Sequence, residues 1–192
     1  MIPSHSHEGV LPPFVPGSTP QIPAHMSPYK ATLLEVAQTF ATSTERITIL
    51  RGLIGYRDAL RGAGITEGFQ WIDGSFVEDC ERVRGRPPGD IDLITFSYRP
   101  ANLADKNLWR QFLQSNPRLF NPTDSKSAFS CDAYFVDLSG HPVHVVNQTR
   151  YWFGLFSHQR DTYLWKGMLQ VDLTADDTEV LDFLDQGEDH AS

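Results

Sequence analysis

Two short apolar runs with acidic residues, joined by a polar loop, constrain the fold of this chain more than any other feature. The stretch from Gly68 to Phe96 reads GFQWIDGSFVEDCERVRGRPPGDIDLITF. Aromatic and β-branched residues such as Trp71 and Ile72 favour a buried strand, and Asp73-Gly74-Ser75 follows as a turn sequence. The stretch therefore predicts a strand, a tight turn, a charged loop and a second strand.

The second of these runs places two carboxylates on one face of its strand. Residues i and i+2 of a strand share a face, so Asp90 and Asp92 point the same way, with Cα atoms about 7 Å apart. Neighbouring carboxylates repel, and burial raises their pKa values, so a divalent cation between them is the arrangement that stabilises both charges. Hard oxygen ligands favour Mg²⁺ or Mn²⁺. The pair thus predicts a metal site.

The turn between the two runs supplies a candidate phosphate site. Glycine lets the backbone approach a ligand closely, and the amides after Gly74, together with the Ser75 hydroxyl, are suited to face a triphosphate at a turn or helix start. A metal site beside a phosphate site indicates nucleotide chemistry.

In this order the residues resemble the signature of the DNA polymerase β-like nucleotidyltransferases, which is an apolar residue, Gly-Ser, a spacer, and Asp-apolar-Asp-apolar. Here it stands as Ile72-Asp73-Gly74-Ser75, a spacer from Phe76 to Gly89, and Asp90-Ile91-Asp92-Leu93. The chain is similar to a small, poorly characterised prokaryotic branch of that superfamily, and this similarity includes the segment from Tyr151 to Gly167. The resemblance implies an α+β fold of the polymerase β palm type, a mixed β-sheet flanked by helices.

The family also needs a third acid on a neighbouring strand, and the run Ser130 to Leu138 offers two. Asp132 and Asp137 are five positions apart, so in a regular strand they face opposite sides and only one can join the pair. We favour Asp132, because it lies inside the run, whereas Asp137 precedes a Ser-Gly turn and is suited to form it. Asp137 stays the alternative.

The resemblance implies a metal-dependent nucleotidyl transfer with release of pyrophosphate. Asp90, Asp92 and Asp132 would be the catalytic acids and the ligands of Mg²⁺ (or Mn²⁺), and Gly74 and Ser75 would bind the nucleoside triphosphate. Arg160 and Lys166 would offset the charge of the triphosphate, of which ATP is one candidate. The acceptor stays open between a tRNA end, a small molecule and a protein hydroxyl of a toxin–antitoxin pair.

A second hypothesis is a catalytically silent module that binds a nucleotide or a partner protein, as a regulator or an antitoxin does. The presence of all three acids favours the enzyme. The net charge of −8 disfavours broad, nonspecific binding of nucleic acid, although a local basic groove remains compatible with it.

Length and composition predict one domain in a reducing cytoplasm, with no membrane span. The chain has 192 residues, 40% of them hydrophobic, and its two cysteines form no disulfide or Cys-x-x-Cys pattern. No apolar run approaches 20 residues, the length that a spanning helix needs. We expect an extended, proline-rich arm over residues 1–27, a domain over 28–186 and a frayed tail over 187–192.

The remaining pattern predicts the elements around the central stretch. We expect helices from Ser27-Pro28 to Ala41 and from Thr42 to Gly62, because each begins with a capping signal. The other expected elements are a surface helix over 101–115, a loop over 121–126, a mostly buried helical segment over 143–156, an edge strand over 167–173 and a helix over 176–184.

Overall fold

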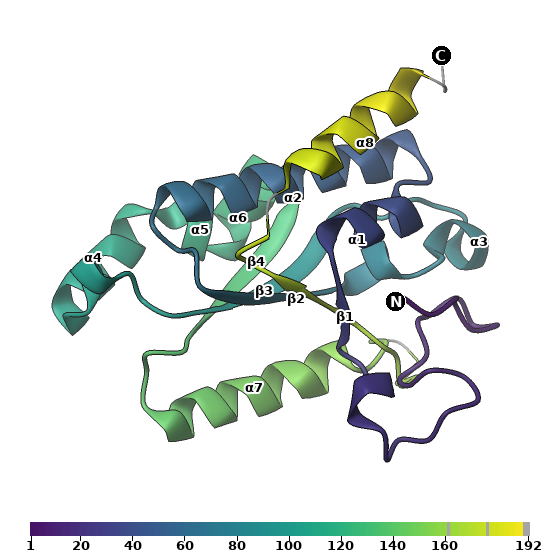
Figure 1. Cartoon of the computed structure of the whole chain (residues 1–192), viewed down its shortest axis with the longest axis horizontal. Coiled ribbons are helices and arrows are strands. Elements are labelled where there is room, and N and C mark those ends of the chain that lie inside the picture. Colours follow the sequence, from purple (N-terminus) through teal and green to yellow (C-terminus); the bar gives the residue numbers. More distant parts are fainter. Residues whose placement is uncertain (161, 176, 190–192) are drawn as a thin grey trace.

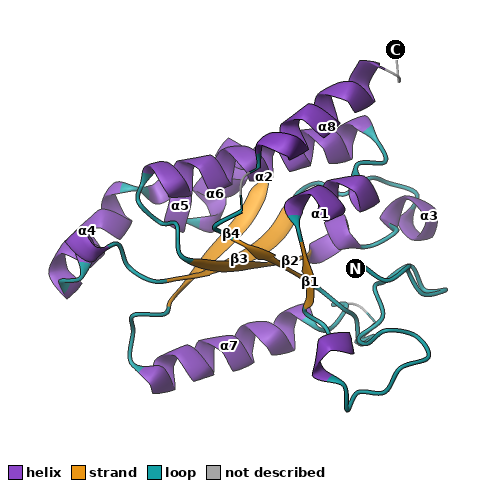
Figure 2. Ribbon diagram, viewed as in Figure 1, coloured by secondary structure: helices purple, strands orange, loops and turns teal. Residues whose placement is uncertain are grey.

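A mixed five-stranded open sheet forms the centre of the computed structural model, which describes residues 1–160, 162–175 and 177–189. The fold is α+β, as the sequence predicted (Figures 1 and 2). The strands are β1 (Tyr29–Ala31), β2 (Gly68–Asp73), β3 (Ile91–Ser97), β4 (Cys131–Asp137) and β5 (Leu169–Asp172). The α-helices among the described residues are α1 (Leu33–Phe40), α2 (Thr44–Gly62), α3 (Cys80–Arg84), α4 (Lys106–Ser115), α5 (Pro117–Phe120), α6 (Pro122–Phe129), α7 (Pro142–Phe156) and α8 (Thr178–Asp189).

The order of the strands is β1-β5-β2-β3-β4. Strand β5 pairs in parallel with β1 and antiparallel with β2, and β3 pairs antiparallel with β2 and in parallel with β4. The expected edge strand over 167–173 is therefore an internal strand. The error arose at Ser27-Pro28, where we expected a helix to begin. That dipeptide instead leads into β1, and α1 begins after Thr32, whose side chain completes a capping box with Glu35.

The sheet separates two apolar cores. On one face, alternate residues of the central strands, among them Ile72, Leu93 and Ala133, pack under α1, α2, α5 and α8. On the other face Trp71, Ile94 and Val136 meet Trp152 and Phe156 of α7. Among the labelled helices, Figure 1 shows α7 below the sheet and the others above it or to its side. A residue's position in the period of two along each strand therefore decides which core it joins.

Further expected helical and loop segments differ in the structure, and one of them, the charged loop expected between the two central strands, contains α3. The loop expected over 121–126 is helix α6, because Asn121 caps the helix and Pro122 occupies its first turn, where a missing amide is harmless. The helix expected over 101–115 begins at Lys106, capped by Asp105. Helix α7 is not mostly core, because Val143 and Val146 are more than 60% exposed and only its inner side packs on the sheet.

The first 27 residues run along the surface without a strand or α-helix, apart from a single 3-10 turn over Pro23–His25. The segment nevertheless reaches the core, since Val10 and Leu11 are buried. Leu11 also accepts a hydrogen bond from the amide of Gly167, just before β5. The arm thus packs against the segment that leads into an internal strand.

The C-terminal part ends in α8, which extends beyond the body of the protein (Figure 1). The tail expected to fray over 187–192 is helical as far as Asp189, and residues 190–192 lie outside the described residues, as does Asp176 at the start of the expected last helix. Among the helices described, none combines the length and the apolar character needed to cross a lipid bilayer.

Candidate active site

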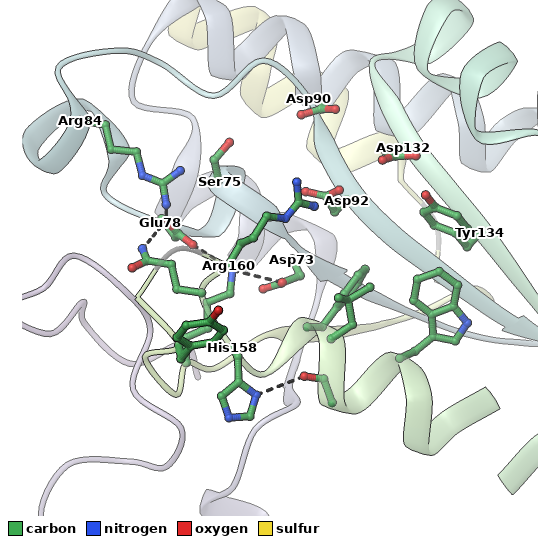
Figure 3. Close-up of a pocket in the computed structure, with 18 of the residues that line it drawn as sticks. Asp73, Ser75, Glu78, Arg84, Asp90, Asp92, Asp132, Tyr134, His158 and Arg160 are labelled. Atoms are coloured by element: carbon green, nitrogen blue, oxygen red, sulfur yellow. Dashed lines mark hydrogen bonds and ion pairs between the residues drawn. The ribbon is translucent and has the colours of Figure 1, made fainter. Parts of the chain in front are cut away.

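Three acids form a row across adjacent strands on the α7 face of the sheet. Asp73, the last residue of β2, pairs in register with Asp92 of β3, and Asp92 pairs with Asp132 of β4. Neighbouring strands are about 4.8 Å apart, so the carboxylates stand side by side (Figure 3). The structure therefore brings Asp92 and Asp132 together and adds an acid, Asp73, that sequence reasoning had treated only as a turn residue.

The fourth acid lies one step beyond this row. Asp90 directly precedes β3, two positions before Asp92, and its carboxylate forms an ion pair with Lys126 of α6. Asp90 raises the pKa of the Lys126 ammonium through this hydrogen bond, and Asp132 and Asp92 raise it further. Lys126 thus provides a positive charge beside three acids. Sequence reasoning missed it, because the loop expected over 121–126 gave it no fixed position.

The Gly74-Ser75 turn begins directly after β2 and packs against Asp92. Gly74 has a φ of +82°, and a Cβ atom there would lie 1.9 Å from Asp92 Oδ2. Only glycine fits this position, because both the left-handed backbone and the close carboxylate exclude a side chain. The following residues form a 3-10 helix over Gly74–Val77. The buried Arg46 holds this turn from behind by donating hydrogen bonds to the carbonyls of Phe76 and Glu78.

A buried ion cluster closes the inner end of the site. The Lys166 ammonium lies 2.9 Å from Glu78 Oε1 and 3.1 Å from Asp73 Oδ2, and its side chain is 4% exposed. Glu78 also binds Arg84, whose Nη2 is 2.5 Å from Glu78 Oε2, and accepts a hydrogen bond from Gln159. Lys166, expected from the resemblance to offset a triphosphate, is therefore already neutralised by two buried acids.

Burial and mutual repulsion raise the pKa values of the acids in the row. Burial raises the pKa of Asp73 to about 7, against the lowering effects of Lys166 and the Gly74 amide. Burial, followed by the charges of Asp90 and Asp132, raises the pKa of Asp92 to about 6. The pKa of Asp132 is also raised, mainly by burial. Such a row is costly without a positive partner, which is the pattern expected of a functional site.

These groups line a cavity of about 750 Å³. The acids and the Gly74-Ser75 turn form one side, and residues of α7 and the segment after it, including Trp152, Leu155, Phe156, His158 and Arg160, form another (Figure 3). Arg84, the last residue of α3, and Arg86, in the loop that leads to β3, also line the cavity. A cavity of this size is in the range of small-molecule and nucleotide sites.

The structure separates the two candidates for the third acid. Asp132 lines the cavity, and beside it Tyr134 follows on the same face of β4, with its ring 4.4 Å from that of Trp152. Asp137 lies at the far end of β4 and binds Arg99, with 2.6 Å between Oδ2 and Nη2. Asp137 therefore lies outside the cavity, and its ion pair with Arg99 accounts for its charge. Tyr134 was not expected in the site, although its spacing of two from Asp132 was a usable signal.

The donor set suits a hard divalent cation by its chemistry. Asp90, Asp92 and Asp132 offer carboxylate oxygens, and burial together with the charges of Asp90 and Asp132 raises the pKa of Asp92. In the part of the chain that the structure describes, no three His, Cys, Asp or Glu side chains are already arranged to hold a metal ion. The ammonium of Lys126 instead pairs with Asp90, on the side where a cation would bind. We conclude that the ligand types fit Mg²⁺ or Mn²⁺.

Comparison with known proteins gives one match. Residues 3–172 match the model of a family of unknown function, DUF6932. The chain belongs to the DUF6932 family. The match includes every acid of the row, the Gly74-Ser75 turn and Lys166, so the site described here lies inside the part that defines this family. No curated protein and no solved structure matches the chain.

Proposed function

We propose that this DUF6932 protein is a nucleotidyltransferase of the polymerase β-like fold, which uses Mg²⁺ or Mn²⁺ to move a nucleoside monophosphate from a triphosphate to a hydroxyl acceptor. The observation that carries this proposal is the adjacency of Asp92 and Asp132 on parallel strands, with Gly74 packed against the carboxylate of Asp92. Metal-binding acids and a glycine turn suited to phosphates thereby share one cavity.

Each part of the cavity has a role in such a transfer. The amides after Gly74 and the Ser75 hydroxyl bind phosphate oxygens, while Arg160, Arg84 and Arg86 supply guanidinium groups for the same charge. Asp90, Asp92 and Asp132 hold the divalent cation, which when bound neutralises phosphate charge and polarises the phosphoryl group.

The reaction itself is an in-line displacement at the α-phosphorus. Asp132 accepts the proton of the acceptor hydroxyl, whose oxygen forms the new bond to phosphorus while the bond to pyrophosphate breaks. Of the acids, Asp132 is suited to this role because it is flanked by Tyr134 and lies on the outer strand of the row. The acceptor is a tRNA end, a protein hydroxyl or a small molecule.

Calorimetry with the four ribonucleoside triphosphates tests this proposal. We expect one of them to bind the native chain in the presence of Mg²⁺ and to lose binding in the Asp90→Ala, Asp92→Ala double variant. Asp132→Asn should abolish transfer, whereas Asp137→Asn is the matched control, because Asp137 is an acid of the same strand outside the cavity. Absence of binding by every triphosphate would refute the proposal.

One observation favours the alternative of a silent nucleotide- or partner-binding module. The ion pair between Lys126 and Asp90 neutralises one acid of the site without any metal. In a silent module this pair is permanent, and triphosphate binding does not depend on Mg²⁺. In an enzyme, the cation displaces Lys126. Titration of the native chain with and without Mg²⁺ therefore separates the two functions.

A further inference from the structure

Residues 5–12 of the N-terminal arm form a strap that binds two segments of the candidate site. At one end the strap contacts residues 77–83, which include most of α3. At the other end it contacts Gly167, the residue directly after Lys166. These two segments carry Lys166 and Glu78, which form a buried ion pair and line the cavity.

Hydrogen bonds and close packing join the strap to the start of α3. The ring Nε2 of His5 donates a hydrogen bond to the carbonyl of Val77, over 3.0 Å. The carbonyl of Gly9 accepts one from the amide of Asp79, over 2.8 Å. Gly9 has a φ of +78°, and a Cβ atom there would lie 2.7 Å from Val83 Cγ1. Because Asp79 is the residue before α3, the strap fixes the position of this helix.

Helix α3 presents a cation to the cavity. Arg84 is its last residue, lines the cavity and binds the carboxylate of Glu78 (Figure 3). Glu78 is 2% exposed and lies between Val77 and Asp79, whose backbone groups bind the strap. A shift of this segment would therefore move both the guanidinium that the proposed function assigns to phosphate and the acid that orients it.

The other end of the strap holds the backbone beside the second partner of Glu78. The carbonyl of Leu11 accepts a hydrogen bond from the amide of Gly167, over 2.7 Å. The packing is close, since a Cβ atom on Gly167 would lie 2.5 Å from the carbonyl oxygen of Pro12. The strap therefore fixes the chain next to Lys166, whose ammonium binds Glu78.

The acids that the proposed function assigns to the cation lie on other elements. Asp90 directly precedes β3, and Asp92 and Asp132 are residues of β3 and β4. The contacts of the strap described above run instead to residues 77–83 and to Gly167. Loosening the strap should therefore disturb the phosphate side of the cavity more than the cation side.

We propose that the strap positions Arg84 and Glu78 for the triphosphate, so that the N-terminal arm controls the affinity for nucleotide but not the affinity for Mg²⁺. This inference rests on the proposed function and deepens it. His5 and Gly9 are positioning residues, because they act through α3. The family match begins at residue 3 and therefore includes the strap.

A matched pair of double variants of the full chain tests this role. The strap variant combines His5→Ala with Gly9→Ala, which removes one hydrogen bond to the segment before α3 and forces Val83 away. The control variant combines His25→Ala with Gly17→Ala in the same arm. The ring of His25 bonds within the arm, and Gly17 has a φ of +80° but nothing within 4 Å of an added Cβ atom.

Calorimetry measures the binding of Mg²⁺ alone and, with Mg²⁺ present, of the ribonucleoside triphosphate that binds the native chain best. We expect the strap variant to bind the triphosphate about 3- to 30-fold more weakly than the native chain, because α3 no longer holds Arg84 in place. Its affinity for Mg²⁺, and both affinities of the control variant, should stay within about 2-fold of the native values. Circular dichroism checks folding, and if the strap variant does not fold, His5→Ala against His25→Ala decides.

A double-mutant cycle with Arg84→Met tests the route through α3. Arg84→Met should weaken triphosphate binding more in the native chain than in the strap variant, where the guanidinium is already displaced. Equal weakening in the two backgrounds would overturn the assignment of the effect to Arg84.

Three results would overturn the inference while leaving nucleotidyl transfer intact. These are unchanged triphosphate binding by the strap variant, equal weakening in the strap and control variants, and a parallel loss of Mg²⁺ binding, which would show a general structural role. Failure of every triphosphate to bind the native chain is a separate outcome, which would overturn the proposed function and this inference with it.

Discussion

Two of the buried ion clusters among the described residues lie on opposite faces of the same sheet, and they differ in how completely the carboxylate at their centre is paired. On the α2 face, Arg57 is fully buried and donates hydrogen bonds to both oxygens of Asp177, to Gln70 and to the carbonyl of Asp172. On the α7 face, Lys166 binds Asp73 and Glu78, but Asp73 Oδ1 has no partner and Asp92 stands beside it.

We interpret the cluster on the α2 face as structural, while the proposed function assigns the cluster on the α7 face to a ligand site. Buried charges are tolerated when hydrogen bonds satisfy them, which the guanidinium of Arg57 achieves with its planar fork. Lys166 holds one carboxylate oxygen of each partner and leaves the row of acids exposed to a cavity. Substitutions should therefore have opposite effects on stability in the two places.

The largest effect is expected for Arg57→Met. Removing Arg57 takes away two hydrogen bonds to Asp177, which is 3% exposed and keeps its ion pair with Arg61. This loss should lower the free energy of unfolding by about 3 kcal/mol. Urea denaturation measures this change. A loss below about 1 kcal/mol would show that the cluster on the α2 face is not the structural one.

A pair of glycine substitutions tests how tightly the turn packs on the acids. Gly74→Ala should lower the free energy of unfolding by more than about 2 kcal/mol, because left-handed strain adds to the clash with Asp92 Oδ2. Gly85→Ala is the matched control, since Gly85 also has a positive φ, of +65°, but its Cβ would meet nothing within 4 Å. It should lose only about 1 kcal/mol, from backbone strain alone.

Thermal or urea denaturation of both glycine variants gives the comparison. Equal losses in the two would mean that the Asp92 carboxylate moves aside at little cost. The site would then be less tightly packed than the structure indicates.

Asp92→Asn should raise stability, in contrast to Arg57→Met. The pKa of Asp92 is about 6 in the folded protein, above its ordinary value of 3.8, so the folded state keeps a proton that the unfolded chain releases. The stability of the native protein therefore falls as pH rises from about 4 to about 6. The asparagine variant lacks this loss and should be more stable by on the order of 2 kcal/mol at pH 8.

Urea denaturation at pH 4 and pH 8 measures this difference for the native chain and the variant. The gain should be present at pH 8 and small at pH 4, where Asp92 is protonated in the folded state and a carboxyl of ordinary pKa 3.8 is still partly protonated in the unfolded chain. If the variant is less stable than the native chain at pH 8, the Asp92 carboxylate stabilises the fold, as the Arg57 cluster does.

The smallest effect is expected for Lys126→Met. The Lys126 side chain is 56% exposed, so loss of its ion pair with Asp90 should change the free energy of unfolding by less than about 1 kcal/mol. Its removal should nevertheless strengthen Mg²⁺ binding several-fold, because the ammonium competes for the same carboxylates. Calorimetric titration measures the affinity for Mg²⁺. Unchanged or weaker binding by the variant would argue that the Lys126 ammonium does not compete with Mg²⁺ for the carboxylates.

The sequence predicted the features that depend on neighbouring residues. It predicted the α+β class and the two strands within the stretch from Gly68 to Phe96. It also predicted that Asp90 and Asp92 share a face, which follows from the period of two along a strand. The prediction of Asp132 as the third acid required more than periodicity. The choice of Asp132 over Asp137 depends on which strand lies beside β3. The assignment of Asp90, Asp92 and Asp132 as metal ligands stays a prediction.

The features that were missed depend on contacts between distant parts of the chain. Asp73 has the sequence of a turn residue, and its second role comes from Lys166, which the fold brings back beside it. The internal position of β5 depends on β1, a three-residue strand with no pattern of its own. Lys126 was missed because Asn121-Pro122 is common both in loops and at the start of helices.

The order of the strands also determines when the cavity can form during synthesis of the chain. Strand β5 occupies the position between β1 and β2, although the ribosome makes it after β1 to β4 and α7. Lys166, which closes the inner end of the cavity, emerges with that last strand. Until then β2 presents an open edge and Asp73 has no cation beside it, so a nascent chain has all four acids of the site but no assembled pocket.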